Sequence, residues 1–319
     1  MGNMSETKGE RYMPTYGMGD AIHEMRIRAG CTQEELAYGI CTPGTLSRIE
    51  NGKEVASKQV FEALCQRLCG MCHMGISFDT KIEMQRSKFR RQALLYLEQR
   101  ELEKAKLALE GYHALKETDN PFCLQFALYT QAVYQAIQRE REEEILPKLE
   151  QALEITMPNY KERMQAAKRK ILLTYDEVYI MSNIGIAYAK NAQLEKAFHI
   201  FYYLKGYLER QRLELSESLK VYAMILGNFA WILEQQGRFE EAVKHCDTGI
   251  RICHLTGKYT VLPHLLCIKA WCLTASGNAI MAKKSRRQAK ALFDITEHYR
   301  GYGSFAEFYK AREPIFVIF

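Results

Sequence analysis

Thr32-Gln33-Glu34-Glu35-Leu36-Ala37 and Thr42-Pro43-Gly44-Thr45-Leu46-Ser47-Arg48-Ile49-Glu50 are the two stretches that decide the fold of the N-terminal part of the chain. The first reads as a capping box, in which Thr32 caps a helix and Glu35 reaches back from its third position. The second starts another helix, with Thr42 as the cap and Pro43 as the first residue. Two short helices joined by a tight turn predict a helix-turn-helix.

Apolar residues at helical spacing extend this unit on both sides. Residues 18–29 predict a first helix that Gly30 ends, and Val60, Leu64 and Leu68 predict a fourth. We therefore expect a flexible tail over residues 1–16, a helix-turn-helix domain over 17–72, a linker over 73–82 and a second domain over 83–319.

The second helix of the motif would present an outer face to DNA. With Leu46 and Ile49 buried, the turn of 100° per residue leaves Arg48 outside, where it can pair with guanine or a phosphate. The alternative is an exposed Arg48 that pairs with a carboxylate. The candidate DNA-binding residues are Gln33, Thr42, Pro43, Gly44, Thr45, Ser47, Arg48, Asn51 and Lys53.

These two blocks, continued by Asn51-Gly52-Lys53, resemble the Xre and phage-repressor family of DNA-binding proteins. The resemblance implies a lambda-repressor-like domain that binds double-stranded DNA, with Glu50 as a structural partner. Charge does not support the same conclusion. The whole chain has a formal charge of +6, but residues 1–80 hold 8 Lys and Arg against 10 Asp and Glu. The prediction rests on the motif.

A second pattern recurs after residue 83. Gly185 and Tyr188 are followed by Ala197 and Phe201, which is the spacing of a tetratricopeptide helix pair. Related patterns surround Ala242 and Ala282, and about five helix pairs fit the remaining length. The sequence thus predicts an all-α protein whose second domain is a right-handed α-solenoid resembling tetratricopeptide repeats.

Such solenoids bind peptides along the concave surface formed by the first helix of each pair. Asn183 and Asn228 occupy equivalent positions in successive repeats, and a side-chain amide can pair with a peptide backbone. The alternative is that each Asn satisfies a neighbouring helix or loop. The candidate peptide-binding residues are Tyr179, Asn183, Ile186, Met224, Asn228 and Trp231.

Three further features have competing interpretations. The cluster Cys65, Cys69, Cys72 and His73 is either a metal site or, as we expect, the buried end of a helix. The basic run of Lys283, Lys284, Arg286, Arg287 and Lys290 is either a solvated helix face or a contact for DNA or an acidic partner. The apolar Phe316-Val317-Ile318-Phe319 is expected to cap the last repeat or to line a dimer seam.

A helix-turn-helix in front of degenerate repeats resembles the Rgg and PlcR type of peptide-pheromone receptors. The resemblance implies a homodimeric transcription regulator controlled by a short signalling peptide. No catalytic motif, cofactor site or apolar run long enough to span a bilayer is evident, so we expect a cytoplasmic protein that is not an enzyme. The alternatives are an adaptor whose repeats sequester a signalling protein, and a regulator whose repeats only dimerise.

Overall fold

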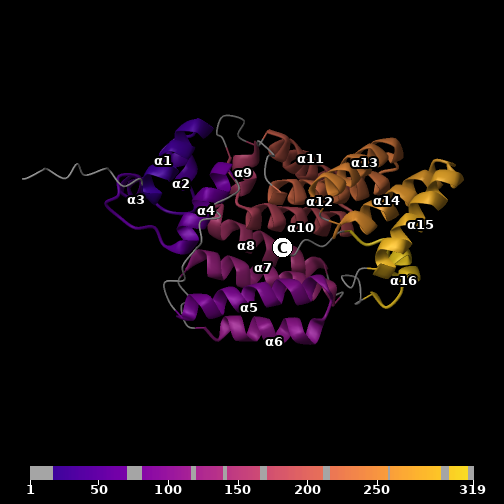
Figure 1. Cartoon of the computed structure of the whole chain (residues 1–319), viewed down its shortest axis with the longest axis horizontal. Helices are drawn as coiled ribbons and strands as arrows, with labels where there is room; N and C mark the ends of the chain where they lie inside the picture. Colours follow the sequence, from indigo (N-terminus) through magenta and orange to yellow (C-terminus); the bar gives the residue numbers. More distant parts are fainter. Residues whose placement is uncertain are drawn as a thin grey trace, which may run out of the picture.

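The computed structural model is entirely helical over the residues that it describes (Figure 1). These are residues 17–69, 81–115, 120–138, 142–165, 171–210, 216–257, 259–295 and 302–314. None of the helices in these ranges combines the length and the apolar character that crossing a lipid bilayer requires.

The first four helices form the predicted helix-turn-helix domain: α1 (Met18–Ala29), α2 (Gln33–Ala37), α3 (Pro43–Glu50) and α4 (Lys58–Cys69). The capping box is present, because the Thr32 hydroxyl accepts from the Glu35 amide and the Glu35 side chain accepts from the Thr32 amide. Thr42 caps α3 by accepting from the amide of Thr45. Both helix starts therefore lie where local sequence predicted them.

Ten of the other helices in the described part of the chain form five antiparallel pairs, in agreement with the prediction of about five. The pairs are α5 (Lys81–Glu98) with α6 (Leu102–His113), α7 (Pro121–Ile137) with α8 (Glu142–Thr156), α10 (Tyr175–Lys190) with α11 (Leu194–Arg210), α12 (Ser216–Gln235) with α13 (Phe239–Thr256), and α14 (Leu262–Ala275) with α15 (Ala279–Ile295). Two short helices, α9 (Tyr160–Gln165) and α16 (Phe305–Ala311), lie outside the pairs. Helix α5 begins two residues before residue 83.

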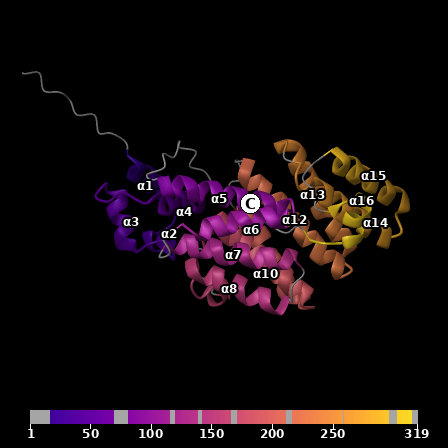
Figure 2. The ribbon, with the colours of Figure 1, turned by 90° about the horizontal axis from the view of Figure 1, so that it is seen from below.

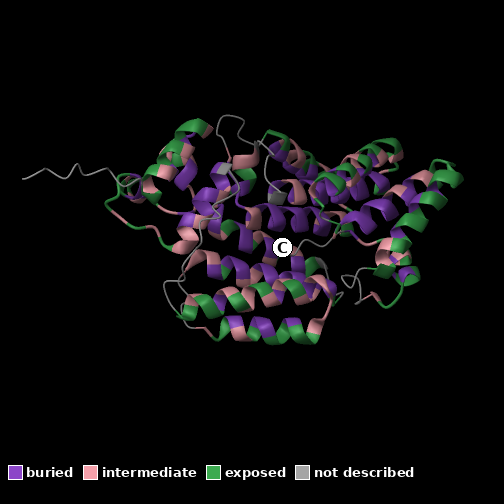
Figure 3. Ribbon diagram, viewed as in Figure 1, coloured by how far each residue is buried: buried purple, intermediate pink, exposed green. Residues whose placement is uncertain are grey.

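Small residues allow the paired helices to approach, as the repeat pattern predicted. A Cβ atom added to Gly185 on α10 would lie 2.8 Å from Cε2 of Phe201 on α11. Ala197 is fully buried in the same pair. Figure 3 shows that buried residues concentrate along α10, α12 and α14, the first helices of three successive pairs. These helices form the central layer of the array.

The helix-turn-helix domain is docked firmly against the repeats. Leu172, which precedes α10, is buried within the core of the N-terminal domain. The Tyr38 hydroxyl donates to the Pro158 carbonyl at 2.6 Å, and the Arg163 guanidinium lies 3.4 Å from the centre of the Tyr38 ring. The turn between α2 and α3 therefore packs against the end of α8 and against α9.

The array closes on itself, because the segments that flank α16 contact the turn between α5 and α6. In Figure 2, α1–α3 lie at one end of the molecule and α14–α16 at the other. Arg100, in the turn between α5 and α6, forms an ion pair with Glu313, which follows α16. The Arg100 guanidinium lies 4.2 Å from the centre of the Tyr302 ring. These contacts join residues more than 200 positions apart in the sequence and limit how far the array can open.

Candidate DNA-binding surface and concave pocket

The predicted DNA-binding residues lie on α3, at its two ends and at the start of α2. The apolar side chains Leu46 and Ile49 of α3 face the core. None of the nine candidates is buried: Thr42, Pro43, Gly44, Arg48, Asn51 and Lys53 are exposed, and Gln33, Thr45 and Ser47 are half-buried. The amphipathic period of α3 therefore produces the expected outer face, although their contact with DNA stays a prediction.

Arg48 is paired with a carboxylate in the absence of DNA, which is the alternative considered above. Its Nε donates to Glu54 Oε2 at 2.7 Å, and its Nη2 donates to Thr45 Oγ1 at 3.3 Å. The Arg48 side chain is 55% exposed. Because an exposed ion pair contributes little stability, a guanine edge or a phosphate can replace Glu54 at small cost.

Glu50 anchors α3 to the rest of the domain. The buried carboxylate accepts from Arg26 at 2.6 and 3.0 Å, from Gln33 at 2.7 Å and from His23 at 3.2 Å. Burial alone would raise the pKa of Glu50, but these hydrogen bonds outweigh burial and the pKa is lowered. The structural role that the resemblance implied for Glu50 is confirmed.

Gln33 and Asn51 make contacts that sequence reasoning missed. The Gln33 amide holds Glu50 and so joins the start of α2 to the end of α3. The Asn51 amide donates to the Ser47 carbonyl at 2.7 Å and closes the last turn of α3. Both residues thus position α3, whatever further contact they make with a phosphate.

The six predicted peptide-binding residues lie together on α10 and α12, but all of them are buried. Asn183 donates to the Tyr129 hydroxyl of α7 at 3.3 Å, and Asn228 donates to Ser182 Oγ of α10 at 3.2 Å. Each Asn therefore bridges to the first helix of the preceding pair. The expectation that these amides face an open concave surface does not match this conformation, because the central helices pack tightly against one another.

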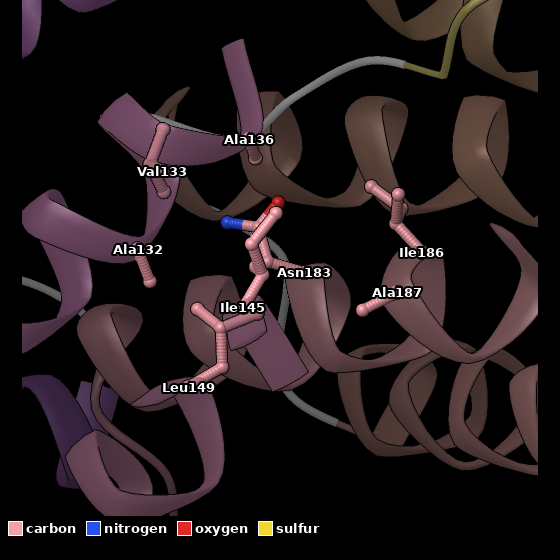
Figure 4. Close-up of a pocket in the computed structure, with 8 residues that line it drawn as sticks. All are labelled: Ala132, Val133, Ala136, Ile145, Leu149, Asn183, Ile186 and Ala187. Carbon is pink, nitrogen blue, oxygen red and sulfur yellow. The ribbon is translucent and has the colours of Figure 1, made fainter. Parts of the chain in front are cut away.

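A small pocket lies between α7, α8 and α10 and includes two of the predicted residues (Figure 4). It is almost entirely apolar, and its free space is only large enough for about one water molecule. The pocket is lined by Ala132, Val133, Ala136, Ile145, Leu149, Asn183, Ile186 and Ala187.

Trp231 contacts the chain's own backbone. Its Nε1 donates to the carbonyl of Arg312 at 2.9 Å. The Arg312 guanidinium lies 3.5 Å from Glu234 and 5.4 Å from the centre of the Trp271 ring. Arg312 and its neighbours were missed by sequence reasoning, because only the closed array brings them beside α12 and α14.

The other features singled out in the sequence have simpler placements. Cys65 is buried in the N-terminal core, whereas the Cys69 side chain, Cys72 and His73 lie outside the described residues. Within the described ranges no group of His, Cys, Asp and Glu is arranged to hold a metal ion. The five basic residues of α15 are all exposed, as a solvated face predicts. Residues 316–319 lie outside the described part of the chain.

Comparison with known proteins agrees with this architecture. Residues 18–71 match the family model described as a helix-turn-helix domain. No curated protein sequence matches the chain. Among solved structures, PlcR from Bacillus thuringiensis in complex with the peptide PapR7 and DNA superposes with a TM-score of 0.58 at 20% identity, covering 92% of this chain and 98% of that one.

The apo form of Bacillus thuringiensis PlcR superposes with a TM-score of 0.55 at 18% identity, covering 92% of this chain and 97% of that one. The likeness establishes a shared fold over nearly the whole length of both chains. The expected architecture, a helix-turn-helix domain followed by helical repeats as in PlcR, is confirmed, and the chain carries a DNA-binding type of domain.

Proposed function

We propose that this chain is a sequence-specific transcription regulator that reads the major groove of double-stranded DNA with α3. The observation that carries the proposal is the exposed face of α3, where Thr45, Ser47 and Arg48 project from a helix anchored by Glu50. A recognition helix places its N-terminal residues at the base edges. One such module has a small interface, so we propose that a homodimer grips two half-sites.

We further propose that a short peptide bound on the concave side of the repeats controls DNA binding. PlcR, which has the same fold, was solved with a peptide and DNA. Two observations on this chain support a similar arrangement. The pocket between α7, α8 and α10 is apolar, and Trp231 donates a hydrogen bond to a backbone carbonyl, that of Arg312 just after α16. Tyr179, Asn183 and Ile186 lie on the same helix as Glu177, which contacts the DNA-binding domain.

A gel shift with the protein's own promoter tests the DNA-binding proposal. Arg48→Ala should weaken binding roughly 5- to 150-fold, since a bidentate arginine–guanine pair is worth about 1–3 kcal/mol. Arg238→Ala is the control, because Arg238 pairs with Glu241 on the surface of α13. If wild type and Arg48→Ala bind equally, α3 does not read the site through Arg48.

Intrinsic tryptophan fluorescence tests the ligand proposal. The chain has two tryptophans, Trp231 and Trp271, and both contact the segment that follows α16. A peptide that binds beside them should shift the emission in a saturable way. If a pool of hydrophobic heptapeptides leaves the emission unchanged and leaves the promoter complex unchanged, the repeats serve assembly alone.

A further inference from the structure

Arg100 stands in the turn between α5 and α6, in a backbone conformation that suits glycine better than arginine. Its φ is +57°, and its amide donates to the carbonyl of Leu97 to close the end of α5. The corresponding turns of the third, fourth and fifth pairs hold the small residues Ala192, Gly237 and Gly277, also at positive φ. A long side chain at positive φ costs free energy that glycine avoids. Its presence in this one turn indicates that the guanidinium has a role there.

The Arg100 guanidinium lies in a mostly buried site formed by the segments that flank α16. It forms an ion pair with Glu313 and lies 4.2 Å from the centre of the Tyr302 ring. The Tyr302 hydroxyl donates to the same carboxylate at 3.3 Å. Only 14% of the Arg100 side chain and 17% of the Glu313 side chain are exposed. The site therefore offers a carboxylate both a charge-assisted partner and a neutral donor.

The residue before Glu313 makes a backbone contact with the inner face of the array. Arg312 also has a positive φ, +50°, and its carbonyl accepts from Nε1 of Trp231 at 2.9 Å. Trp231 and Arg100 thus hold a backbone carbonyl and the carboxylate of the following residue. The last two residues of any peptide present the same pair of groups, and so does an aspartate or glutamate within a peptide.

A second indole on this face lacks a hydrogen bond. Trp271 on α14 is the counterpart of Trp231 in the next helix pair, and the Arg312 guanidinium lies 5.4 Å from the centre of its ring. Its Nε1 is buried and has no acceptor within the part of the chain that the structure describes. A buried donor without an acceptor is unfavourable. The segment after α16 therefore satisfies one of the two indoles, and a ligand with further carbonyls can satisfy both.

We propose that Arg100, Tyr302 and Trp231 form a binding site for a carboxylate and the backbone carbonyl before it. The chain's own Arg312 and Glu313 occupy this site and inhibit ligand binding until a peptide displaces them. The matching ligand carries its carboxylate at the C-terminus or on an aspartate or glutamate side chain. Displacement breaks the link between the first helix pair and the segment after α16. Because the ligand is a peptide, this site rests on the proposed function.

The contact made by Glu313 can be tested without any ligand or DNA. Glu313→Gln removes the charge that pairs with Arg100 and should loosen the segment that covers Trp231 and Trp271. Acrylamide quenching of the tryptophan emission should then rise about two-fold, because a charge-assisted hydrogen bond is lost. Glu307→Gln, at an exposed position on α16, is the control and should be quenched like the wild type. Equal quenching of all three proteins would overturn the proposal.

Fluorescence anisotropy with three pools of fluorescein-labelled hydrophobic heptapeptides tests the ligand chemistry. One pool has a free C-terminal carboxylate, the second has a C-terminal amide, and the third has the amide with glutamate as its last residue. Glu313→Gln should bind a carboxylate-bearing pool at least about ten-fold more tightly than the wild type does. The pool without a carboxylate should gain much less. The pool that gains more identifies the source of the carboxylate.

The positioning of the carboxylate by Arg100 is tested in the same assay. Arg100→Gln should bind the carboxylate and amide pools alike, whereas Arg238→Gln, in the exposed pair on α13, should keep the wild-type preference. Binding of all three pools with equal affinity to the wild type and to Glu313→Gln would overturn the carboxylate site and leave peptide control standing. Binding of no pool to any of these proteins would contradict peptide control, and the site with it.

Discussion

The guanidinium of Arg67 on α4 lies 2.8 Å from the Glu177 carboxylate on α10, and both side chains are almost completely buried. Arg67 also donates to the carbonyls of Leu36 and Tyr38, and Glu177 accepts from the Thr156 hydroxyl. This ion pair therefore joins the DNA-binding domain to a helix whose other end lines the pocket. The contact between α4 and α10 is direct, with no loop between the two side chains.

Removal of one partner of this pair should be strongly destabilising. Glu177→Ala leaves the Arg67 charge buried, and we expect a loss of about 3–5 kcal/mol in the free energy of unfolding. The double variant Arg67→Met, Glu177→Leu should recover much of this loss, because it buries no charge. Arg238→Ala, in the exposed pair with Glu241, should change stability by less than about 1 kcal/mol. Urea denaturation measures the free energy of unfolding of all three variants. Equal losses in all three would contradict a special role of the buried Arg67–Glu177 pair in stability.

The docking of the two domains can be tested at Gly39. Its φ is +69°, and an added Cβ would lie 1.8 Å from the Thr156 carbonyl oxygen. Gly52 has a φ of +67° but open space around it, so Gly52→Ala measures the backbone cost alone, about 1–2 kcal/mol. Gly39→Ala should cost clearly more, and its melting temperature should be the lower one. Equal melting temperatures of the two variants would mean that the turn at Gly39 does not pack against the end of α8.

The carboxylate beside Arg48 should restrain DNA binding. Glu54→Gln removes a negative charge at the proposed DNA face and releases Arg48, so promoter affinity should rise several-fold. Glu241→Gln, in the Arg238 pair on α13, is the matched control and should leave affinity unchanged. Fluorescence anisotropy at two salt concentrations measures both. Weaker binding by Glu54→Gln would show that Glu54 orients Arg48 productively.

The lowered pKa of Glu50 leads us to expect a loss of stability in acid. Its pKa is lowered in the folded protein, so its contribution is present above the pKa of the unfolded glutamate and is lost as the pH falls through the folded value. Glu50→Gln should flatten the fall in melting temperature below about pH 4.3, the ordinary glutamate range. Glu24→Gln, an exposed carboxylate paired with Arg28, should keep the wild-type profile.

For Glu98 we expect the opposite dependence of stability on pH. Burial raises its pKa to about 8, and nearby Lys220 opposes only part of that rise. The protonated form is therefore favoured by folding, and stability is lost as the pH rises toward 8. Glu98→Gln should raise the melting temperature at pH 8.5 and leave it nearly unchanged at pH 4. Glu103→Gln on the exposed face of α6 is the control. An equal rise in melting temperature at pH 8.5 in both variants would show that the effect does not come from the raised pKa of Glu98.

The helix starts and the outer face of α3 could be predicted from sequence because the interactions that create them are local. Thr32 and Glu35 cap each other across three residues, and burial of Leu46 and Ile49 fixes by helical period which side of α3 faces out. The close packing at Gly185 and Phe201 follows from the repeat pattern in the same way. Residue type and spacing alone determine these features.

The state of the concave face depends on contacts between distant parts of the chain. Asn183 and Asn228 have the pattern of ligand contacts, yet hydroxyls 54 and 46 residues away accept their hydrogen bonds. Trp231 donates to a carbonyl 81 residues later. The helical period and the residue types place these side chains on the inner helices. The curvature of the array decides which hydrogen-bond partner lies next to each of them. The sequence thus determined the helix-turn-helix fold, the helical repeats and the outer face of α3. The tertiary structure decided how the inner face is filled, because burial there is a property of the closed array.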